Sequence, residues 1–119
     1  MSKLVTLKKN KDFNRLYAKG KSFVSPSLVV YVSRNKLGFT RIGITTSKKI
    51  GKAVDRNRAR RVIKESYRKI APFVKDGIDI VFVARGKTTH VKSDVVLKAM
   101  TEILESISVL HINGKETCG

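Results

Sequence analysis

The sequence predicts an α+β fold, in which helices pack on one mixed sheet of about four strands in the order helix–strand–strand–helix–strand–helix. Apolar residues recur at spacings of three and four in three segments, and β-branched residues dominate three others. The chain has 119 residues, of which 41% are hydrophobic, enough for the core of one domain over residues 1–119. We expect a core over about residues 5–110 and a short tail over 111–119.

The first helix is predicted over residues 11–19. Asn10 is suited to cap it, and Gly20 to end it. Phe13, Leu16 and Tyr17 share one face because they lie at positions i, i+3 and i+4.

Two strands are predicted next, over residues 28–32 and 39–46, with a turn at 34–38 between them. The short link predicts that they pair as an antiparallel hairpin. Alternate residues of a strand point to opposite faces, so one face carries Leu28, Val30 and Val32 and the other Val29 and Tyr31. In the second strand, Ile42 and Ile44 lie on the apolar face.

A basic connection over 47–52 is expected to add a short strand, and a long helix follows over 53–71 until Pro72 stops it. A third strand is predicted at 78–84, and a last helix at 94–108 with Ser93 as its cap. The strand at 39–46, the long helix and the strand at 78–84 form a crossover unit, for which general chirality predicts a right hand. The buried stripes of the two helices are predicted to be Ala59, Val62, Ile63, Ser66, Tyr67 and Ile70, and Val96, Ala99, Met100, Ile103, Leu104 and Ile107.

Positive charge is concentrated in the first two thirds of the chain. Residues 1–77 hold 21 Lys/Arg and 4 Asp/Glu, which accounts for the net charge of +17, whereas residues 78–119 hold five of each sign. A folded domain needs a net charge of only about 2–8 for solubility. The excess therefore predicts a polyanionic partner, with RNA or DNA favoured over an anionic membrane surface.

Cations are densest in the long helix. Arg56, Arg60, Lys64 and Arg68 are spaced by four and form a cationic ridge, flanked by Arg58 and Arg61. Like charges at this spacing destabilise an isolated helix, and a polyanion offsets the repulsion. The alternative is a solvated helix face, although such faces normally mix charge signs.

Aromatic residues provide a second possible contact surface. A sheet face with Val29, Tyr31, Arg41, Gly43 and Thr45 is an unusual mixture for a core, and it suits a surface on which unpaired bases stack. The alternative is that Phe13 and Leu16 are ordinary core residues beneath a short helix, and periodicity leaves that choice open.

Other chemistry has little support in the sequence. His90 and His111 have no neighbouring ligands at zinc spacing, and no nucleophilic triad or phosphate-binding loop is present. The few scattered acidic residues do not build a two-metal nuclease site. A single cysteine, Cys118, fits the reducing cytoplasm, and no apolar stretch has the length of a signal peptide or a membrane span.

The residues from Lys48 to Glu65, KKIGKAVDRNRARRVIKE, resemble the signature of the bacterial ribonuclease P protein family. Its Arg-Asn-Arg centre corresponds here to residues 56–58. The resemblance extends over about residues 5–108 and includes Asp12-Phe13, Leu28–Tyr31, Arg41–Ile44 and Ile80–Arg85.

The resemblance implies a subunit without catalytic groups of its own. Its partners would be a large catalytic RNA, which holds the active-site Mg²⁺ ions, and precursor tRNA, whose 5′ leader the assembled enzyme removes. It also implies one protein monomer per RNA, no membrane, and a left-handed crossover in place of the generic right-handed one. A weak Mg²⁺ site near Arg56–Arg58 would accompany them.

The resemblance implies two sets of site residues. The leader cleft would comprise Phe13, Tyr17, Val29 and Tyr31, with Lys49 nearby. RNA binding would fall to the basic connection and helix, at Lys48, Lys49, Lys52, Arg56, Asn57, Arg58, Arg60, Arg61, Lys64 and Arg68. The competing hypotheses are a ribosomal or RNA-chaperone protein, a self-sufficient nuclease and a major-groove DNA reader.

Overall fold

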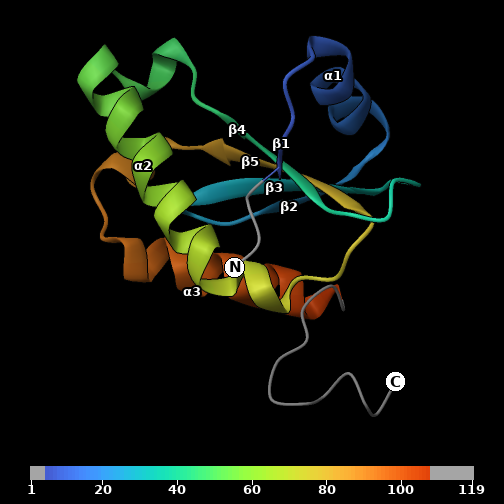
Figure 1. Cartoon of the computed structure of the whole chain (residues 1–119). Coiled ribbons are helices and arrows are strands. Elements are labelled where there is room, and N and C mark those ends of the chain that lie inside the picture. Colours follow the sequence, from blue (N-terminus) through green and yellow to red (C-terminus); the bar gives the residue numbers. More distant parts are fainter. Residues whose placement is uncertain (1–4, 108–119) are drawn as a thin grey trace.

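A computed structural model describes residues 5–107, apart from the side chains of Lys48 and Lys87. Its centre is one five-stranded mixed sheet in the order β1-β4-β5-β3-β2 (Figure 1). The strands are β1 (Val5–Thr6), β2 (Lys21–Val24), β3 (Leu28–Arg34), β4 (Arg41–Thr45) and β5 (Ile78–Ala84). The α-helices are α1 (Asn10–Lys19), α2 (Ala53–Ile70) and α3 (Ser93–Ser106), and short 3₁₀ turns cover Lys48–Ile50, Ala71–Phe73 and Gly86–Thr89.

The predicted hairpin is wrong, because β5 lies between β3 and β4. β5 pairs antiparallel with β3 and parallel with β4, so α2 is the crossover between two adjacent parallel strands. The physical reason is that β5 is apolar on both faces except at Asp79, and six of its seven residues are buried. Such a strand is most stable in the centre of a sheet with helices on both faces. The hand of the crossover stays a prediction.

The expected count of about four strands is also corrected. The fourth and fifth strands are the short edge strands β1 and β2, whereas the connection expected to add a strand forms the 3₁₀ turn Lys48–Ile50. Two-residue and four-residue edge strands carry too little periodic signal to be recognised. The expected caps are displaced by one residue, since Asn10 and Ser93 lie inside their helices, after Lys9 and Lys92.

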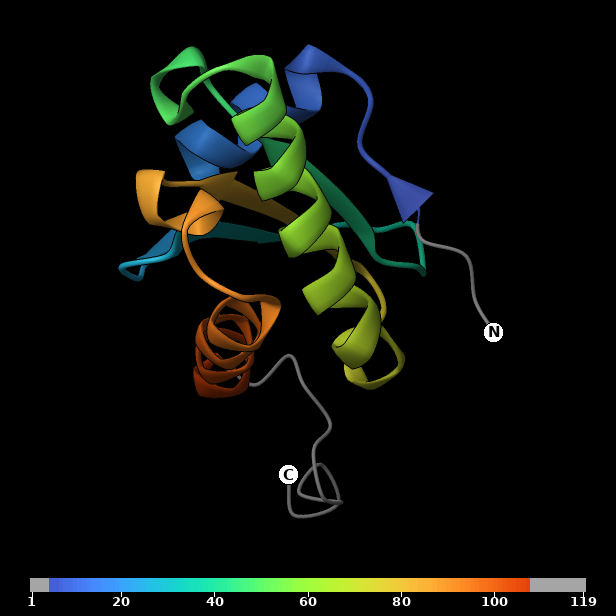
Figure 2. The ribbon, with the colours of Figure 1, turned by 90° about the vertical axis from the view of Figure 1, so that its left-hand side faces the viewer.

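The main core lies between the sheet and the α2/α3 layer (Figures 1 and 2). The predicted alternation is confirmed, because Leu28, Val30, Ile42, Ile80 and Phe82 face this core from the sheet. The helix stripes are confirmed as well. Their buried centres are Ala59, Ile63, Ser66, Tyr67 and Ile70 in α2 and Val96, Met100 and Leu104 in α3, with Val62, Ala99, Ile103 and Ile107 partly buried around them.

Helix α1 packs alone on the opposite face of the sheet (Figure 1). Leu16 is fully buried there against Leu7 and Val81. Phe13 lies over Gly43, where a Cβ atom would approach the phenyl ring to 2.6 Å. The absence of a side chain at Gly43 therefore lets α1 lie close to the sheet, and one short helix leaves part of this face open.

Candidate nucleic-acid interface

Strand register arranges the sheet face beneath α1 into three rows. The first row is Arg41, Asp79 and Ser33; the second is Gly43, Val81, Tyr31 and Ser22; and the third is Thr45, Val83, Val29 and Val24. Helix α1 covers the first two rows through Arg15, Phe13 and Leu16. The third row remains partly open, and Val24 is 69% exposed.

The four residues predicted for the leader cleft lie together beside this open row. The Tyr17 ring meets the Tyr31 ring edge-on at 5.0 Å and lies 6.4 Å from the Phe13 ring. The Tyr17 hydroxyl is 2.6 Å from the hydroxyl of Thr45, so Tyr17 spans from α1 to β4. We call Phe13, Tyr17, Val29 and Tyr31 the aromatic patch.

Both sequence interpretations of this helix face hold in part. Leu16 is a core residue with no exposed surface, as the core alternative required. Phe13 is partly buried, whereas Tyr17 is 38% exposed and Tyr31 is half-buried. Ring surface is therefore available mainly on the two tyrosines, whose hydroxyl groups add polar handles to apolar rings.

The N-terminal half of α2 begins at the same end of the sheet as the aromatic patch. One nitrogen of Arg60 donates to the carbonyl oxygen of Ile44 at 3.3 Å and another to the hydroxyl of Thr46 at 3.2 Å. Thr46 directly follows Thr45, the partner of Tyr17. Arg60 of α2 therefore lies at the border of the aromatic patch, and the exposed Lys49 lies in the preceding 3₁₀ turn.

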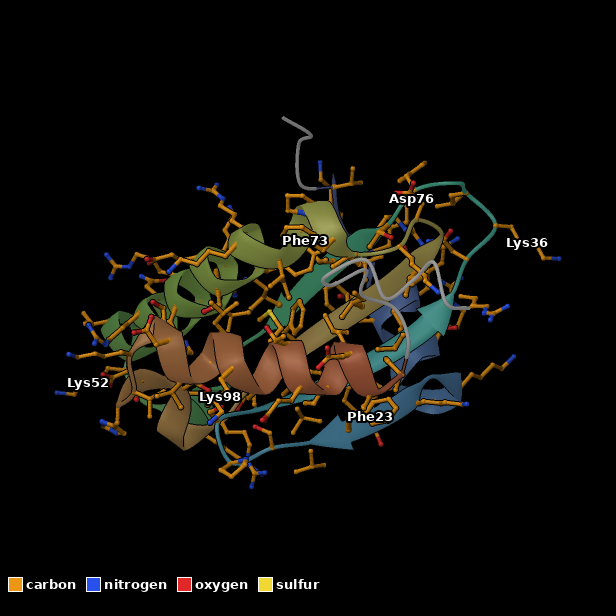
Figure 3. The ribbon with its side chains drawn as sticks, turned by 90° about the horizontal axis from the view of Figure 1, so that it is seen from below. Phe23, Lys36, Lys52, Phe73, Asp76 and Lys98 are labelled. Carbon is orange, nitrogen blue, oxygen red and sulfur yellow. The ribbon has the colours of Figure 1, made fainter. Side chains whose placement is uncertain are left out.

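The predicted ridge divides into tethered and outward-facing cations. Arg56 donates to the Gly51 carbonyl and Arg58 to the Thr89 carbonyl, both at 3.0 Å. A guanidinium has five N–H donors, so most donors of these residues stay available to a ligand. The remaining predicted RNA-binding residues with described side chains are exposed: Lys49, Lys52, Asn57, Arg61, Lys64 and Arg68. Figure 3 shows Lys52 projecting from one end of the molecule, and the side chain of Lys48 lies outside the described structure.

The structure explains why a glycine occupies position 51 in the Lys-Lys-Ile-Gly-Lys segment. Gly51 has a φ of 141°, which L side chains rarely adopt, and a Cβ atom there would lie 2.5 Å from Oδ2 of Asp55. That oxygen accepts the backbone N–H of Lys52 at 3.1 Å. Gly51 and Asp55 together fix the direction in which α2 leaves the sheet.

A buried carboxylate ties α1 to the sheet at the first row. The side chain of Asp79 has no exposed surface, and it accepts hydrogen bonds from Arg15 at 2.8 Å, from Arg41 at 2.7 and 2.9 Å, and from Asn35 at 2.8 Å. Burial alone would raise its pKa. The donated hydrogen bonds and the two positive charges outweigh burial and hold the pKa of Asp79 below its usual value.

The ion pairs between described residues all join Arg15 or Arg41 to Asp12 or Asp79. The cations of α2 therefore have no carboxylate partner among residues 5–107, and they remain available to an external polyanion.

The described residues do not build a metal site of their own. Within residues 5–107, no group of three His, Cys, Asp or Glu side chains is placed to hold an ion. Beside Arg56–Arg58 the sequence offers one carboxylate, Asp55, which already caps α2 amid positive charge. The weak Mg²⁺ site that the resemblance implies near Arg56–Arg58 stays a prediction, since Mg²⁺ is often held by only one or two carboxylates together with waters. His90 is exposed, whereas His111 and Cys118 lie outside the described residues.

No helix within residues 5–107 combines the length and the apolar character that crossing a bilayer requires.

Sequence reasoning missed Val24 and Val83, which extend the open row beside the aromatic patch. The period-two alternation of β5 placed Val83 on this face, but only the register of β5 with β3 shows that it neighbours Val29.

A partly exposed aromatic patch with a cation of a basic helix at its border is an arrangement that nucleic-acid-binding proteins use. Comparisons with known proteins agree with this class. The Ribonuclease P family model matches residues 1–108. The Thermoanaerobacter sp. (strain X514) ribonuclease P protein component is 42% identical over 102 residues, covering 86% of this chain and 88% of the relative. The Clostridioides difficile ribonuclease P protein component is 54% identical over 80 residues, covering 66% and 70% of the two chains.

Comparison with solved structures leads to the same family. The Staphylococcus aureus RNase P protein structure superposes with a TM-score of 0.79 at 33% identity, covering 91% of this chain and 99% of that one. The chain belongs to the ribonuclease P protein family. The resemblance seen in the sequence is confirmed, and so is the α+β fold predicted from the pattern of helices and strands.

Proposed function

We propose that this chain is the protein subunit of a ribonuclease P, and that it binds both a catalytic RNA and the 5′ leader of precursor tRNA. The observation that carries the proposal is that Arg60 of α2 reaches Ile44 and Thr46 at the end of β4, next to Thr45, the partner of Tyr17 in the aromatic patch. The family relationship supports the enzyme, and this arrangement supports a role in binding. Catalytic groups are assigned to the RNA, a choice supported by the finding that within residues 5–107 no group of three or more His, Cys, Asp or Glu side chains is placed to hold a metal ion.

The aromatic patch is assigned to the unpaired leader. Every base has an apolar ring face, so a stack on an aromatic side chain tolerates any sequence and contributes about 1–3 kcal/mol per base. Tyr17 and Tyr31 offer ring surface, and Val29 and Val83 extend the apolar floor. Arg60 borders this surface and, with the exposed Lys49 of the turn before α2, is assigned to the leader's phosphates.

The outward cations of α2 are assigned to the RNA subunit. Arg61, Lys64 and Arg68 are exposed, and they follow each other along one side of an 18-residue helix. Arginine grips phosphate oxygens with two parallel N–H groups, while lysine acts as a mobile point charge. Each phosphate contact should steepen the salt dependence of binding by about 0.7–0.9 on a log–log scale.

The proposed mechanism is differential binding. Precursor tRNA carries a leader and mature tRNA does not, so contacts to the leader favour the substrate over the product. The protein thereby raises substrate affinity without slowing product release. Mg²⁺ is proposed to be held mainly by the RNA subunit, and the cations of this chain lower the Mg²⁺ concentration that assembly needs by offsetting phosphate repulsion.

The test uses the protein reconstituted with the ribonuclease P RNA of the Thermoanaerobacter relative. Affinities for precursor tRNAs of increasing leader length are compared with the affinity for mature tRNA. Tyr17→Ala removes an exposed ring from a helix that tolerates alanine, and it should weaken precursor binding at least about 5-fold, as expected for one lost stack. Binding of mature tRNA should not change. Phe73→Ala is the matched control, because Phe73 is 49% exposed and lies in the turn that follows the C-terminal end of α2, outside the patch (Figure 3).

Equal losses for precursor and mature tRNA would contradict a leader site at the aromatic patch. A ribosomal or RNA-chaperone protein would show no dependence on leader length. Cleavage by the purified protein with Mg²⁺, but without RNA subunit, would contradict the assignment of catalysis to the RNA. A single cut at the 5′ end of the tRNA, only when both subunits are present at low Mg²⁺, is the expected result.

A further inference from the structure

Helix α1 has a second flank, which faces away from the aromatic patch. Lys11, Arg15 and Lys19 are spaced by four residues, so they lie along one side of the helix about 6 Å apart. They form one wall of a pocket of about 810 Å³. The opposite wall comes from the end of β3 and the following loop and includes Arg34 and Lys36.

The charge of this pocket is almost entirely positive. Eight of its 15 lining residues are Lys or Arg, and one, Asp12, is acidic. Asp12 is already shared, at 3.8 Å each, between Arg15 and Arg41. Arg41 and Arg15 are balanced by Asp79, but no ion pair between described residues involves Lys11, Lys19, Arg34 or Lys36. Converging like charges cost free energy in a folded protein, and a bound polyanion offsets that cost.

The pocket is separate from the surface assigned to the leader. Helix α1 lies between the pocket and the aromatic patch. Its Leu16 is fully buried against the sheet, so this side chain fills the space beneath the helix. Figure 3 shows Lys36 and Lys52 at opposite ends of the molecule, so the pocket and the start of α2 lie far apart. An RNA leader bound to the aromatic patch would have to pass across the outer surface of α1 to enter the pocket.

We propose that this pocket binds the phosphodiester backbone of a second RNA segment, belonging to the RNA subunit and not to the leader. The inference rests on the proposed function, and it adds a contact at the end of the molecule opposite to the start of α2 (Figure 3). Charge complementarity identifies the ligand as a polyanion. Leu37 and Phe39, which are 48% and 43% exposed at the pocket, give apolar surface for a ribose or an unpaired base. Binding at both ends fixes the orientation of the protein on its RNA.

The test compares two variants of equal net charge. Lys11→Gln/Lys36→Gln neutralises one exposed lysine on each wall of the pocket. Lys92→Gln/Lys98→Gln removes two exposed lysines, at the N-cap and in the middle of α3, that do not line it and do not belong to α2. Affinity for the Thermoanaerobacter ribonuclease P RNA is measured against salt concentration without tRNA. Leader-length dependence of precursor binding is then measured with the assembled enzyme.

Each lost phosphate contact should reduce the log–log salt slope by about 0.7 and the affinity at about 0.1 M salt by about 5-fold. The pocket variant should therefore lose about 25-fold in affinity for the RNA subunit, with leader dependence unchanged, while the control keeps the wild-type slope. Equal affinity in the pocket and control variants would overturn the inference. Weakened leader dependence with normal affinity for the RNA subunit would overturn it too, because the pocket would then hold the leader. If the wild-type protein itself neither bound the RNA subunit nor showed leader dependence, the proposed function would fail and this inference with it.

Discussion

Replacing Asp79 with asparagine should destabilise the protein by about 3 kcal/mol. Asp79 accepts four hydrogen bonds from three side chains and has no exposed surface. Asp79→Asn removes the negative charge and turns an N–H donor toward the donors of Arg15 or Arg41. Removing one partner of a buried ion pair costs about 3–5 kcal/mol. The lower end applies because the Arg15 side chain is 45% exposed, so that solvent screens part of its charge.

A loss of this size is large compared with the total stability of a small domain, about 5–15 kcal/mol. It corresponds to a fall in Tm of about 12 °C, at about 4 °C per kcal/mol. The assay is urea unfolding followed by far-ultraviolet circular dichroism, at a fixed salt concentration because the net charge is high. The urea midpoint should fall with no change in m-value. Asp76→Asn, at an exposed carboxylate, is the control and should have little effect.

The pH dependence provides a second readout. Because the folded-state pKa of Asp79 is lowered, its stabilisation is fully present above its unfolded pKa of about 3.9 and is lost as pH falls through the folded pKa. The stability gap between wild type and Asp79→Asn should therefore be constant near neutral pH and should narrow in acid. A gap below about 0.5 kcal/mol at neutral pH, the size of an ordinary surface substitution, would refute the argument.

Two further predictions concern the start of α2 and the core. Gly51→Ala should destabilise the protein by about 1–3 kcal/mol in urea unfolding, because it strains a positive φ and crowds the Asp55 carboxylate. Gly86→Ala is the control and should be neutral, since a Cβ atom there meets open space. Equal stability of the two variants would contradict this account of Gly51. Burial, with a smaller contribution from the charge of Asp76, raises the pKa of Tyr67 to about 12. Tyr67 should therefore stabilise the fold fully below about pH 10, and this stabilisation should be lost as pH rises through 12. Phenolate absorbance during alkaline titration, compared with a Tyr67→Phe variant, checks it, and ionisation of Tyr67 near its ordinary pKa would count against its burial.

Long periodic segments were predicted well from the sequence. Helix α2 was expected over 53–71 and spans Ala53–Ile70, and β5 was expected over 78–84 and spans Ile78–Ala84. Their patterns repeat over enough residues to determine the period and the buried face. The site residues on α2 follow from the same periodicity, since a cationic ridge next to a buried stripe has to face outward.

Strand pairing was predicted poorly. A short link between two strands favours a hairpin, but the apolar β5 displaces β4 from β3 and takes the central place. The spacing of Lys11, Arg15 and Lys19 is visible in the sequence, but it does not predict a pocket. The pocket forms because the end of β3 and the following loop place Arg34 and Lys36 opposite this side of α1.

Local order along the chain thus decided the helices, the faces of the strands, the net charge and the family signature, because those properties depend on residues a few positions apart. The tertiary structure decided which strands are neighbours, which of Phe13, Leu16 and Tyr17 keeps an exposed side chain, and that Asp79 meets Arg15 across 64 positions of chain. Such properties arise from long-range packing, in which the strand that gains most from burial on both faces takes the centre and the other elements arrange around it.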